Sequence, residues 1–221
     1  MKLFKINYFN YFDIIKAVLK WRKKMNINYK PMGMYQTNCY IVEVDGKEFI
    51  IDPGVDATDW VIENTKNPVA ILNTHGHFDH IWSNKELKEK LNIPIYVPKD
   101  DEFMLKDDPF GQGTPPSQAD FLVIGDQEFD INDVRVKYFH FPGHTPGCSA
   151  ILIGDSLFSG DFVFKGSIGR VDFPYSNPDD MKESIEKFLH IEENWTIYTG
   201  HGEPTNVKTE QRTLPMWLNM I

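Results

Sequence analysis

The sequence is poor in cysteine, in positive charge and in long apolar runs, and each shortage argues against a class of protein. Two cysteines, Cys39 and Cys148, occur among 221 residues, so a disulfide framework is excluded and a reducing, cytoplasmic location is expected. The formal net charge of -9 would repel phosphate backbones, so no nucleic-acid partner is expected. The N-terminal apolar run "IIKAVL" is interrupted by Lys16, so no transmembrane segment is expected.

Positive charge is concentrated at the beginning of the chain. The first 24 residues hold seven Lys or Arg and one Asp, a charge of +6, so residues 25–221 carry -9 minus 6, or -15. Such asymmetry indicates a separate segment. We therefore predict that residues 1–24 are a basic N-terminal extension and that the working domain covers residues 25–221, starting at the strand-like run "MNINYKPMGM".

From residue 25 onward, short β-rich runs alternate with helical patterns. The strand-like runs are "NCYIVEV", "KEFIID", "VAILNT", "VRVKYFHF", "SAILIG" and "WTIYTG", and helices are predicted at about 57–66, 80–91, 178–190 and 207–219. A meander followed by mixed strands and helices favours two mixed sheets packed face to face with helices outside. Residues 106–120, rich in Gly, Pro and Asp, predict a long loop of the kind that often binds or covers a ligand.

The stretch "NTHGHFDH", residues 73–80, holds three of the seven histidines. His144 in "FPGHTPG", His201 in "TGHGEPT" and Asp161 in "FSGDF" also follow apolar runs and lie beside glycines. Residues at strand ends converge on one rim of a sheet, and imidazole and carboxylate groups suit zinc, iron or manganese. These residues therefore predict a metal site.

The number of candidate ligands predicts two metal ions. His75 and His77 lie two residues apart, unlike the paired histidines of helical zinc proteases, and a catalytic zinc takes about three protein ligands. We expect zinc, with iron or manganese as alternatives, and two ions roughly 3.5 to 4 Å apart could hold a bridging hydroxide. The predicted ligands are His75, His77 and His144 for one ion, Asp79, His80 and His201 for the other, and Asp161 as the bridge.

The motifs "THGHFDH", "PGHTPG", "GD" at 160–161 and "GHG" at 200–202 resemble, in this order, those of the metallo-β-lactamase superfamily. Within it, "GDFVFKGSIGRVDFP" and "TGHGEPTNVKTEQRTLP" are similar to the small, single-domain glyoxalase II-like hydrolases, which act on hydroxyacylglutathione. The resemblance implies an α/β fold, an αββα sandwich of two mixed sheets with outer helices. It also implies hydrolysis of a small-molecule thioester or related ester by a hydroxide that bridges two metal ions, with Asp79 and Asp161 as catalytic residues.

One departure from glyoxalase II concerns the substrate. Those enzymes use a C-terminal helical domain for part of the glutathione site, whereas this chain ends about twenty residues after His201, so the glutathione pocket is expected to be incomplete or different. Arg170 in "GSIGR" stands where the family has a Lys for the glycyl carboxylate. Arg170 is therefore predicted to bind substrate, with a surface ion pair as the alternative. Asp52 and His140 are predicted to support the ligands from behind.

Other functions remain open at this stage. A persulfide dioxygenase-like oxidoreductase would hold one iron, which would map to His75, His144 and Asp161. A lactone or ester hydrolase of the same superfamily, or a binding protein with an inactive site, are further alternatives. The complete ligand set and the intact "GHGEPT" around His201 favour the dinuclear hydrolase. The physiological substrate, the metal and any homo-oligomeric state are left undecided.

Overall fold

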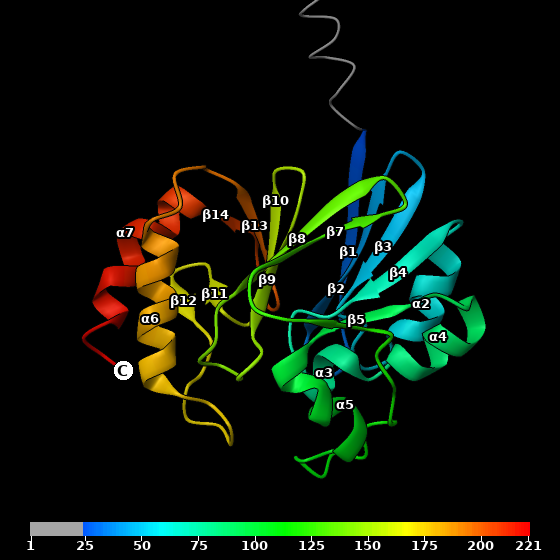
Figure 1. Ribbon diagram of the computed structural model, residues 1–221, viewed down its shortest axis with the longest axis horizontal. Helices are drawn as coiled ribbons and strands as arrows, with labels where there is room; N and C mark the ends of the chain where they lie inside the picture. Colours follow the sequence, from blue (N-terminus) through cyan, green and yellow to red (C-terminus); the bar gives the residue numbers. More distant parts are fainter. Residues whose placement is uncertain (1–23) are drawn as a thin grey trace, which may run out of the picture.

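Two six-stranded sheets pack face to face at the centre of the protein, and helices cover their outer faces (Figure 1). The structure, a computed structural model, describes residues 24–221. The predicted extension therefore falls outside the described residues except for Lys24, and its separation from the domain stays a prediction. None of the helices in the described part of the chain has the length and apolar character needed to cross a membrane.

The first sheet has the strand order β1-β2-β3-β4-β5-β6. Its first three strands pair antiparallel and its last four pair parallel, so the sheet is mixed. The strands are β1 (Met25–Met32), β2 (Thr37–Val44), β3 (Lys47–Ile51), β4 (Pro68–Leu72), β5 (Ile95–Pro98) and β6 (Phe121–Val123). The helices on this side are α2 (Ala57–Asn64), α3 (Phe78–Ile81), α4 (Asn84–Leu91), the 3-10 turn η1 (Lys99–Asp101) and α5 (Glu102–Asp107).

The second sheet has the order β14-β13-β10-β9-β8-β7. It is also mixed, because β10 pairs parallel with β13, while all the other neighbouring strands of this sheet pair antiparallel. The strands are β7 (Gln127–Ile131), β8 (Val134–His140), β9 (Ser149–Ile153), β10 (Ser156–Gly160), β13 (Thr196–Thr199) and β14 (Thr205–Asn206). The remaining elements are the small hairpin β11 (Val163–Phe164) and β12 (Ser167–Ile168), and the outer helices α6 (Pro178–Leu189) and α7 (Val207–Trp217).

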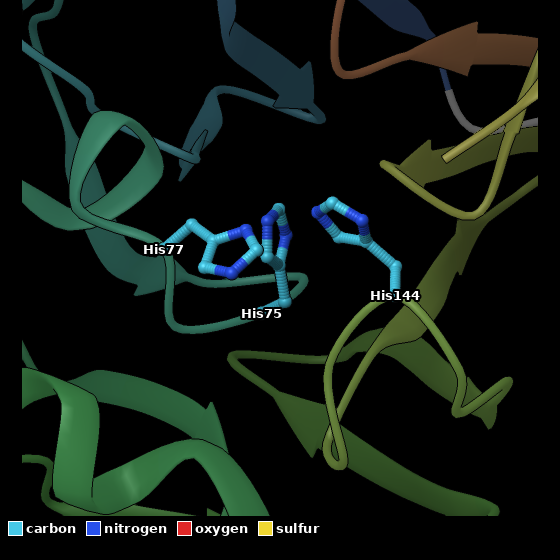
Figure 2. Close-up of side chains that lie close together, drawn as sticks. All are labelled: His75, His77 and His144. Atoms are coloured by element: carbon cyan, nitrogen blue, oxygen red, sulfur yellow. The ribbon is translucent and has the colours of Figure 1, made fainter. Parts of the chain in front are cut away.

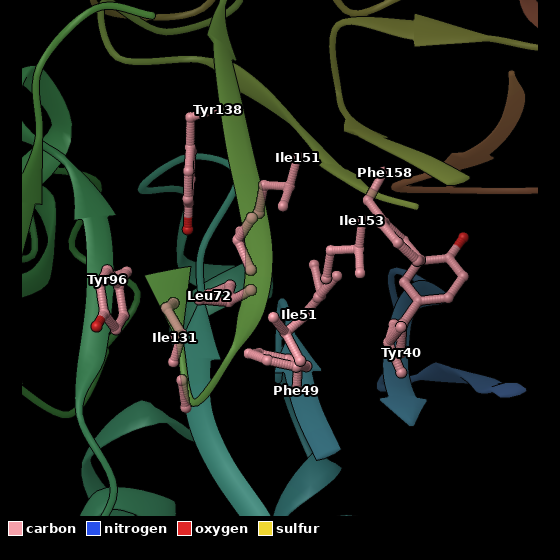
Figure 3. Close-up of a cluster of buried hydrophobic side chains, with 14 of the residues drawn as sticks. Tyr40, Phe49, Ile51, Leu72, Tyr96, Ile131, Tyr138, Ile151, Ile153 and Phe158 are labelled. Carbon is pink, nitrogen blue, oxygen red and sulfur yellow. The ribbon is translucent and has the colours of Figure 1, made fainter. Parts of the chain in front are cut away.

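Strand β3 shows how the four layers arise. Phe49 and Ile51 belong to the core between the sheets (Figure 3), whereas Ile50 belongs to the core that the first sheet shares with α2 and α4. Strand β10 divides in the same way, with Phe158 between the sheets and Leu157 toward α6 and α7. Because both faces of these strands are buried, they read in the sequence as continuous apolar runs. The predicted αββα sandwich is confirmed.

Some predicted boundaries were wrong. The helix predicted at about 80–91 is two helices, α3 and α4, separated at Trp82 and Ser83. Ser83 causes the break, because its amide and hydroxyl donate to the carbonyl oxygens of Pro53 and Gly54 at 3.0 and 2.7 Å. The loop predicted from residue 106 starts after α5, at residue 108. Strands β5 and β6 were not predicted, because four and three residues are too few to show an alternation.

Asp101 is a buried carboxylate that joins the two sheets at one end. Its Oδ2 accepts hydrogen bonds from the Gly76 amide at 2.9 Å and the Thr145 hydroxyl at 2.6 Å, and its Oδ1 accepts one from the Gly147 amide at 2.6 Å. Gly76 lies in the turn after β4, and the other two lie in the turn between β8 and β9. Burial raises the pKa of Asp101 to about 6, so the group is still charged at neutral pH.

We predict that Asp101→Ala separates these two turns. The change leaves two buried amides without an acceptor, at roughly 1 to 3 kcal/mol each, so the free energy of unfolding should fall by about 2 to 6 kcal/mol. Denaturant unfolding measures the difference. Asp100→Ala is the matched control, because Asp100 is exposed on the same turn and should change stability by less than about 0.5 kcal/mol. Similar losses in both variants would contradict the joining role.

Candidate metal centre

The seven side chains predicted to bind metal meet at one rim of the two sheets. Each follows a strand, so the ends of β4, β8, β10 and β13 bring together residues that lie far apart in the sequence. The positions are His75, His77, Asp79 and His80 after β4, His144 after β8, Asp161 after β10 and His201 after β13.

His75, His77 and His144 form a first group of three. One ligand atom from each lies within 4.8 Å of the others, and their rings face a common point in Figure 2. The ring centroids are 4.9 Å apart for His75 and His77, 5.1 Å for His75 and His144, and 4.5 Å for His77 and His144. This geometry could hold one ion, as the sequence predicted.

Asp79, His80 and His201 form a second group with the same 4.8 Å limit. Asp161 reaches both groups. Its Oδ1 lies 3.3 Å from His80 Nε2, and its Oδ2 lies 3.4 Å from His201 Nε2 and 3.5 Å from His144 Nε2. Asp161 therefore occupies the place that the predicted bridge requires, although the ligand roles themselves stay a prediction.

Backbone carbonyls fix the orientation of two imidazoles. Nδ1 of His144 lies 2.8 Å from the Arg170 carbonyl oxygen, and Nδ1 of His201 lies 3.1 Å from the Tyr35 carbonyl oxygen. Because a carbonyl oxygen only accepts, Nδ1 must donate in both pairs. Nε2 is then directed into the site, as in histidines that bind metal through one nitrogen and are held through the other.

Asp52 also fixes the orientation of two imidazoles, one from each group: His80 directly and His75 through Thr74. Its Oδ2 accepts from His80 Nδ1 at 3.0 Å and from the Thr74 hydroxyl at 2.6 Å. Since the Thr74 hydrogen is used in this way, its oxygen accepts from His75 Nδ1, at 3.0 Å. Asp52, His75 and His80 also come within 4.8 Å of one another, but Oδ2 of Asp52 is engaged by these donors and Oδ1 accepts from the Thr74 amide at 2.8 Å. Asp52 lies where the predicted supporting residue should.

Several buried polar atoms at this rim lack a hydrogen-bond partner. Buried polar atoms in proteins are nearly always paired, so each such atom calls for an explanation. A divalent cation is the partner that imidazole and carboxylate groups have in common. The residues present therefore fit bound metal. The unpartnered atoms are Nε2 of His75, His77, His80 and His144, and Oδ1 of Asp161.

Burial and charge divide the histidines into two kinds. Burial lowers the pKa of His77 to about 3 and also lowers the pKa values of His75 and His144, so the first group is neutral and ready to bind a cation. Burial opposes the charged forms of His80 and His201 as well, but Asp161 and Asp79 outweigh it. They raise the pKa of His80 well above its ordinary value and that of His201 to about 9.

Two glycines allow the backbone to approach the acidic ligands closely. A Cβ atom on Gly54 would lie 1.8 Å from the carbonyl oxygen of Asp79, and one on Gly169 would lie 1.8 Å from that of Asp161. No side chain fits at these distances. The loops that carry Gly54 and Gly169 therefore press directly on the backbone of the two aspartates and help to hold them in place.

A cavity of about 620 Å³ opens over the centre, and most of its wall is apolar. The predicted loop contributes Phe110 and Gln112 to the wall. The other lining residues are Tyr35, His77, Phe78, Asp79, His144, Asp161, Phe164, Ile168, Arg170, Phe173 and His201.

Arg170 and His140 were also predicted near the site, and the structure gives each of them a different set of contacts. Arg170 lines the cavity, as predicted for a substrate contact, but its guanidinium also forms the alternative ion pair, with Asp172 at 2.7 Å. The hydrogen bonds of His140 go to Asp126, Pro146 and Lys187 and not to a predicted ligand. Its Nε2 lies 2.9 Å from the Pro146 carbonyl oxygen, so it braces the turn that carries His144.

Sequence reasoning missed Thr37 and Thr74. The Thr37 hydroxyl donates to Asp79 Oδ2 at 2.6 Å, and Thr74 links His75 to Asp52. Thr37 begins a strand 42 residues before Asp79, and a lone threonine carries no local signal. Thr74 lies inside the motif "NTHGHFDH", and its position directly before His75 was the sequence signal that could have indicated its role.

Comparison with known sequences gives one family over most of the chain. The family described as the metallo-beta-lactamase superfamily matches residues 32–201. The probable metallo-hydrolase YqgX of Bacillus subtilis (strain 168) is 35% identical over 210 residues, covering 89% of this chain and 97% of that protein. The hydroxyacylglutathione hydrolase GloC of Haemophilus influenzae (strain ATCC 51907 / DSM 11121 / KW20 / Rd) is 31% identical over 209 residues, covering 86% and 97%.

Solved structures share the fold. The B3 metallo-beta-lactamase BLEG-1 superposes with a TM-score of 0.77 and 31% identity, covering 87% of this chain and 99% of that chain. TTHA1623 in a di-iron-bound form superposes with a TM-score of 0.74 and 31% identity, covering 84% and 98%. The αββα fold, the family match over residues 32–201 and the nearly full-length relatives together show that this chain belongs to the metallo-β-lactamase superfamily.

Proposed function

We propose that the protein is a metal-dependent hydrolase that cleaves a thioester with two divalent metal ions. The observation that carries the proposal is the set of buried, unpartnered Nε2 and Oδ1 atoms gathered into two groups around Asp161. His75, His77 and His144 would hold one ion and Asp79, His80 and His201 the other. Asp161 would contact both. Zinc suits this donor set, and iron and manganese remain alternatives.

Bound divalent ions supply Lewis acidity and make water nucleophilic at neutral pH. The residues of the chain position the reactants. Asp79 lines the cavity, and the Thr37 hydroxyl holds its Oδ2. Although burial alone would raise its pKa, His80 and His201 lower the pKa of Asp79 to about 2, so the carboxylate stays ionised. Asp79 therefore orients the attacking water by accepting its hydrogen bond.

The leaving group favours a thioester over an amide. An amine must gain a proton in order to leave, whereas a thiol with a pKa of about 8.5 leaves as a thiolate. Apart from the predicted ligands, Tyr35 and Arg170 are the titratable residues among those that line the cavity, and Arg170 does not give up its proton. The wall is therefore poor in general acids, which suits a leaving group that needs none.

The relatives support the same class of reaction. GloC is a hydroxyacylglutathione hydrolase by name, and hydroxyacylglutathione is a thioester. YqgX is described only as a probable metallo-hydrolase. BLEG-1 is a metallo-beta-lactamase, which opens an amide, and its likeness keeps ester or lactam hydrolysis as the second candidate.

We predict close to two metal ions per chain. Elemental analysis of protein purified without added metal, and after metal addition and dialysis, measures the ratio. Asp161→Ala should weaken metal binding by more than about 100-fold and lower turnover of thioesters in parallel, because the lost carboxylate serves both positions and even residues behind ligands contribute 10- to 100-fold. Asp155→Ala, an exposed change on the turn before β10, should alter neither.

The main competing function gives a different result in the same experiment. A persulfide dioxygenase-like enzyme would contain one iron per chain and consume oxygen with a persulfide substrate. Consistent recovery of one iron together with such oxygen uptake would overturn the hydrolase. Two bound ions with no activity on any thioester, but with activity on lactones or lactams, would keep the metal centre and reject the thioesterase.

We also predict that the stability of metal-free protein decreases at alkaline pH. The pKa of His201 is raised from 6.5 to about 9 in the folded chain, so its bound proton stabilises the fold fully below about pH 6.5. That stabilisation is lost as the pH rises through 9. Thermal unfolding in chelator should show a falling Tm between pH 7 and pH 9.5. Metal-loaded protein should lack this slope, since the ion replaces the proton, and an equal slope in both forms would contradict the assignment.

A further inference from the structure

Aromatic rings surround the predicted metal centre on several sides. The centroids of Phe110 and Phe173 lie 5.0 and 5.9 Å from that of His77, and the Phe164 centroid lies 6.0 Å from that of His201. Tyr35 and Phe78 pack edge to face at 5.1 Å in the same wall. A substrate in this cavity would therefore contact apolar surface next to the reacting bond.

The Lys and Arg side chains near the cavity are already paired with carboxylates. The segments 33–35, 106–112, 163–173 and 201–203, which supply lining residues, contain three Lys or Arg residues. Each one forms an ion pair with a carboxylate of the protein. The pairs are Lys106 with Glu102 at 2.6 Å, Lys165 with Glu203 at 2.7 Å and Arg170 with Asp172 at 2.7 Å.

Asp172 holds Arg170 especially well. Arg170 Nε donates to Asp172 Oδ1 at 2.8 Å and Nη2 donates to Oδ2 at 2.7 Å, so the pair is bidentate. The guanidinium carbon also lies 4.2 Å from the centroid of the Phe173 ring. To bind Arg170, a substrate carboxylate would have to displace Asp172. Asp172 lies only two residues away on the same loop, so its effective concentration is high.

We propose that Asp172 determines specificity by occupying Arg170, so that the site selects thioesters whose acyl and thiol parts are uncharged and apolar or aromatic. The inference rests on the proposed thioester hydrolysis and narrows its substrate class. It differs from the role predicted for Arg170, because glutathione carries two carboxylates and one ammonium group. Because Lys106, Lys165 and Arg170 are paired, the described residues of these segments offer those carboxylates no vacant Lys or Arg side chain.

The remaining charge near the cavity strengthens the preference. Besides Asp172 and Glu203, these segments carry Asp107 and Asp108, so four carboxylates stand against three Lys or Arg side chains. The whole chain has a net charge of -9. An anionic substrate approaches an acidic surface, which slows its association, while a neutral one is unaffected.

Binding of two matched thioethers tests the proposal without requiring turnover. N-Acetyl-S-benzylcysteamine and S-benzylglutathione share the benzyl thioether group and differ in charge, and neither is hydrolysed. Isothermal titration with metal-loaded protein should give a Kd at least about fivefold lower for the neutral ligand. Equal or tighter binding of S-benzylglutathione would overturn the proposal.

Three variants then locate the cause. Asp172→Asn should free Arg170 and tighten S-benzylglutathione binding by roughly two- to fivefold, the range of an exposed ion pair, with no change for the neutral ligand. The double variant Arg170→Gln with Asp172→Asn should lose this gain. Glu128→Gln, which breaks the exposed pair with Arg135 on β7 and β8, removes the same unit of charge elsewhere and should change neither Kd.

The outcomes separate this inference from the proposed function. No change in S-benzylglutathione binding on Asp172→Asn, or a gain that persists in the double variant, would overturn the role of Asp172. A kcat/KM panel of neutral and charged thioesters should follow the binding preference. If no thioester is hydrolysed by fully loaded protein, the proposed function fails, while the thioether measurements still decide whether the cavity selects neutral ligands.

Discussion

Two buried carboxylates that share one imidazole are the constraint on which the rest of the site depends. Oδ2 of Asp79 lies 3.5 Å and Oδ2 of Asp161 lies 3.4 Å from His201 Nε2. Two like charges this close in a buried site stay ionised only when cations compensate them. In metal-free protein, protons on His80 and His201 provide the compensation. Under the proposed assignment, metal ions would replace those protons.

The architecture serves this constraint by bringing strand ends from both sheets to one rim. The side chains come from the turns and the short helix α3 that follow the strands, so these segments must be held in place. Asp101 joins the turn after β4 to the turn between β8 and β9, and Gly54 and Gly169 let neighbouring loops press on the aspartates. Each device uses buried hydrogen bonds or close backbone contact. The rigidity of the centre therefore comes from the layer of residues behind the ligands.

The convergence of the seven candidate ligands was predictable from the sequence because each lies in a short motif, beside a glycine or another candidate ligand, after an apolar strand. The sandwich was predictable as well, because strands that are buried on both faces appear in the sequence as apolar runs. Asp101 and Thr37 were not predictable. Their partners lie 25 to 46 residues away, and a single Asp or Thr carries no periodic signal. The pairing of Arg170 with Asp172 was open at the sequence level, because spacing alone does not show which carboxylate an arginine will meet.

Asp52 has a consequence for how binding of one ion would affect binding of the other. One of its oxygens accepts hydrogen bonds from His80 and from Thr74, and Thr74 accepts from His75. Under the proposed assignment, these histidines belong to different ion positions. An ion on His80 makes its Nδ1 hydrogen more acidic and draws electron density from the shared oxygen, which reaches His75 through Thr74. The two positions are then thermodynamically linked, and by reciprocity each changes the affinity of the other by the same factor.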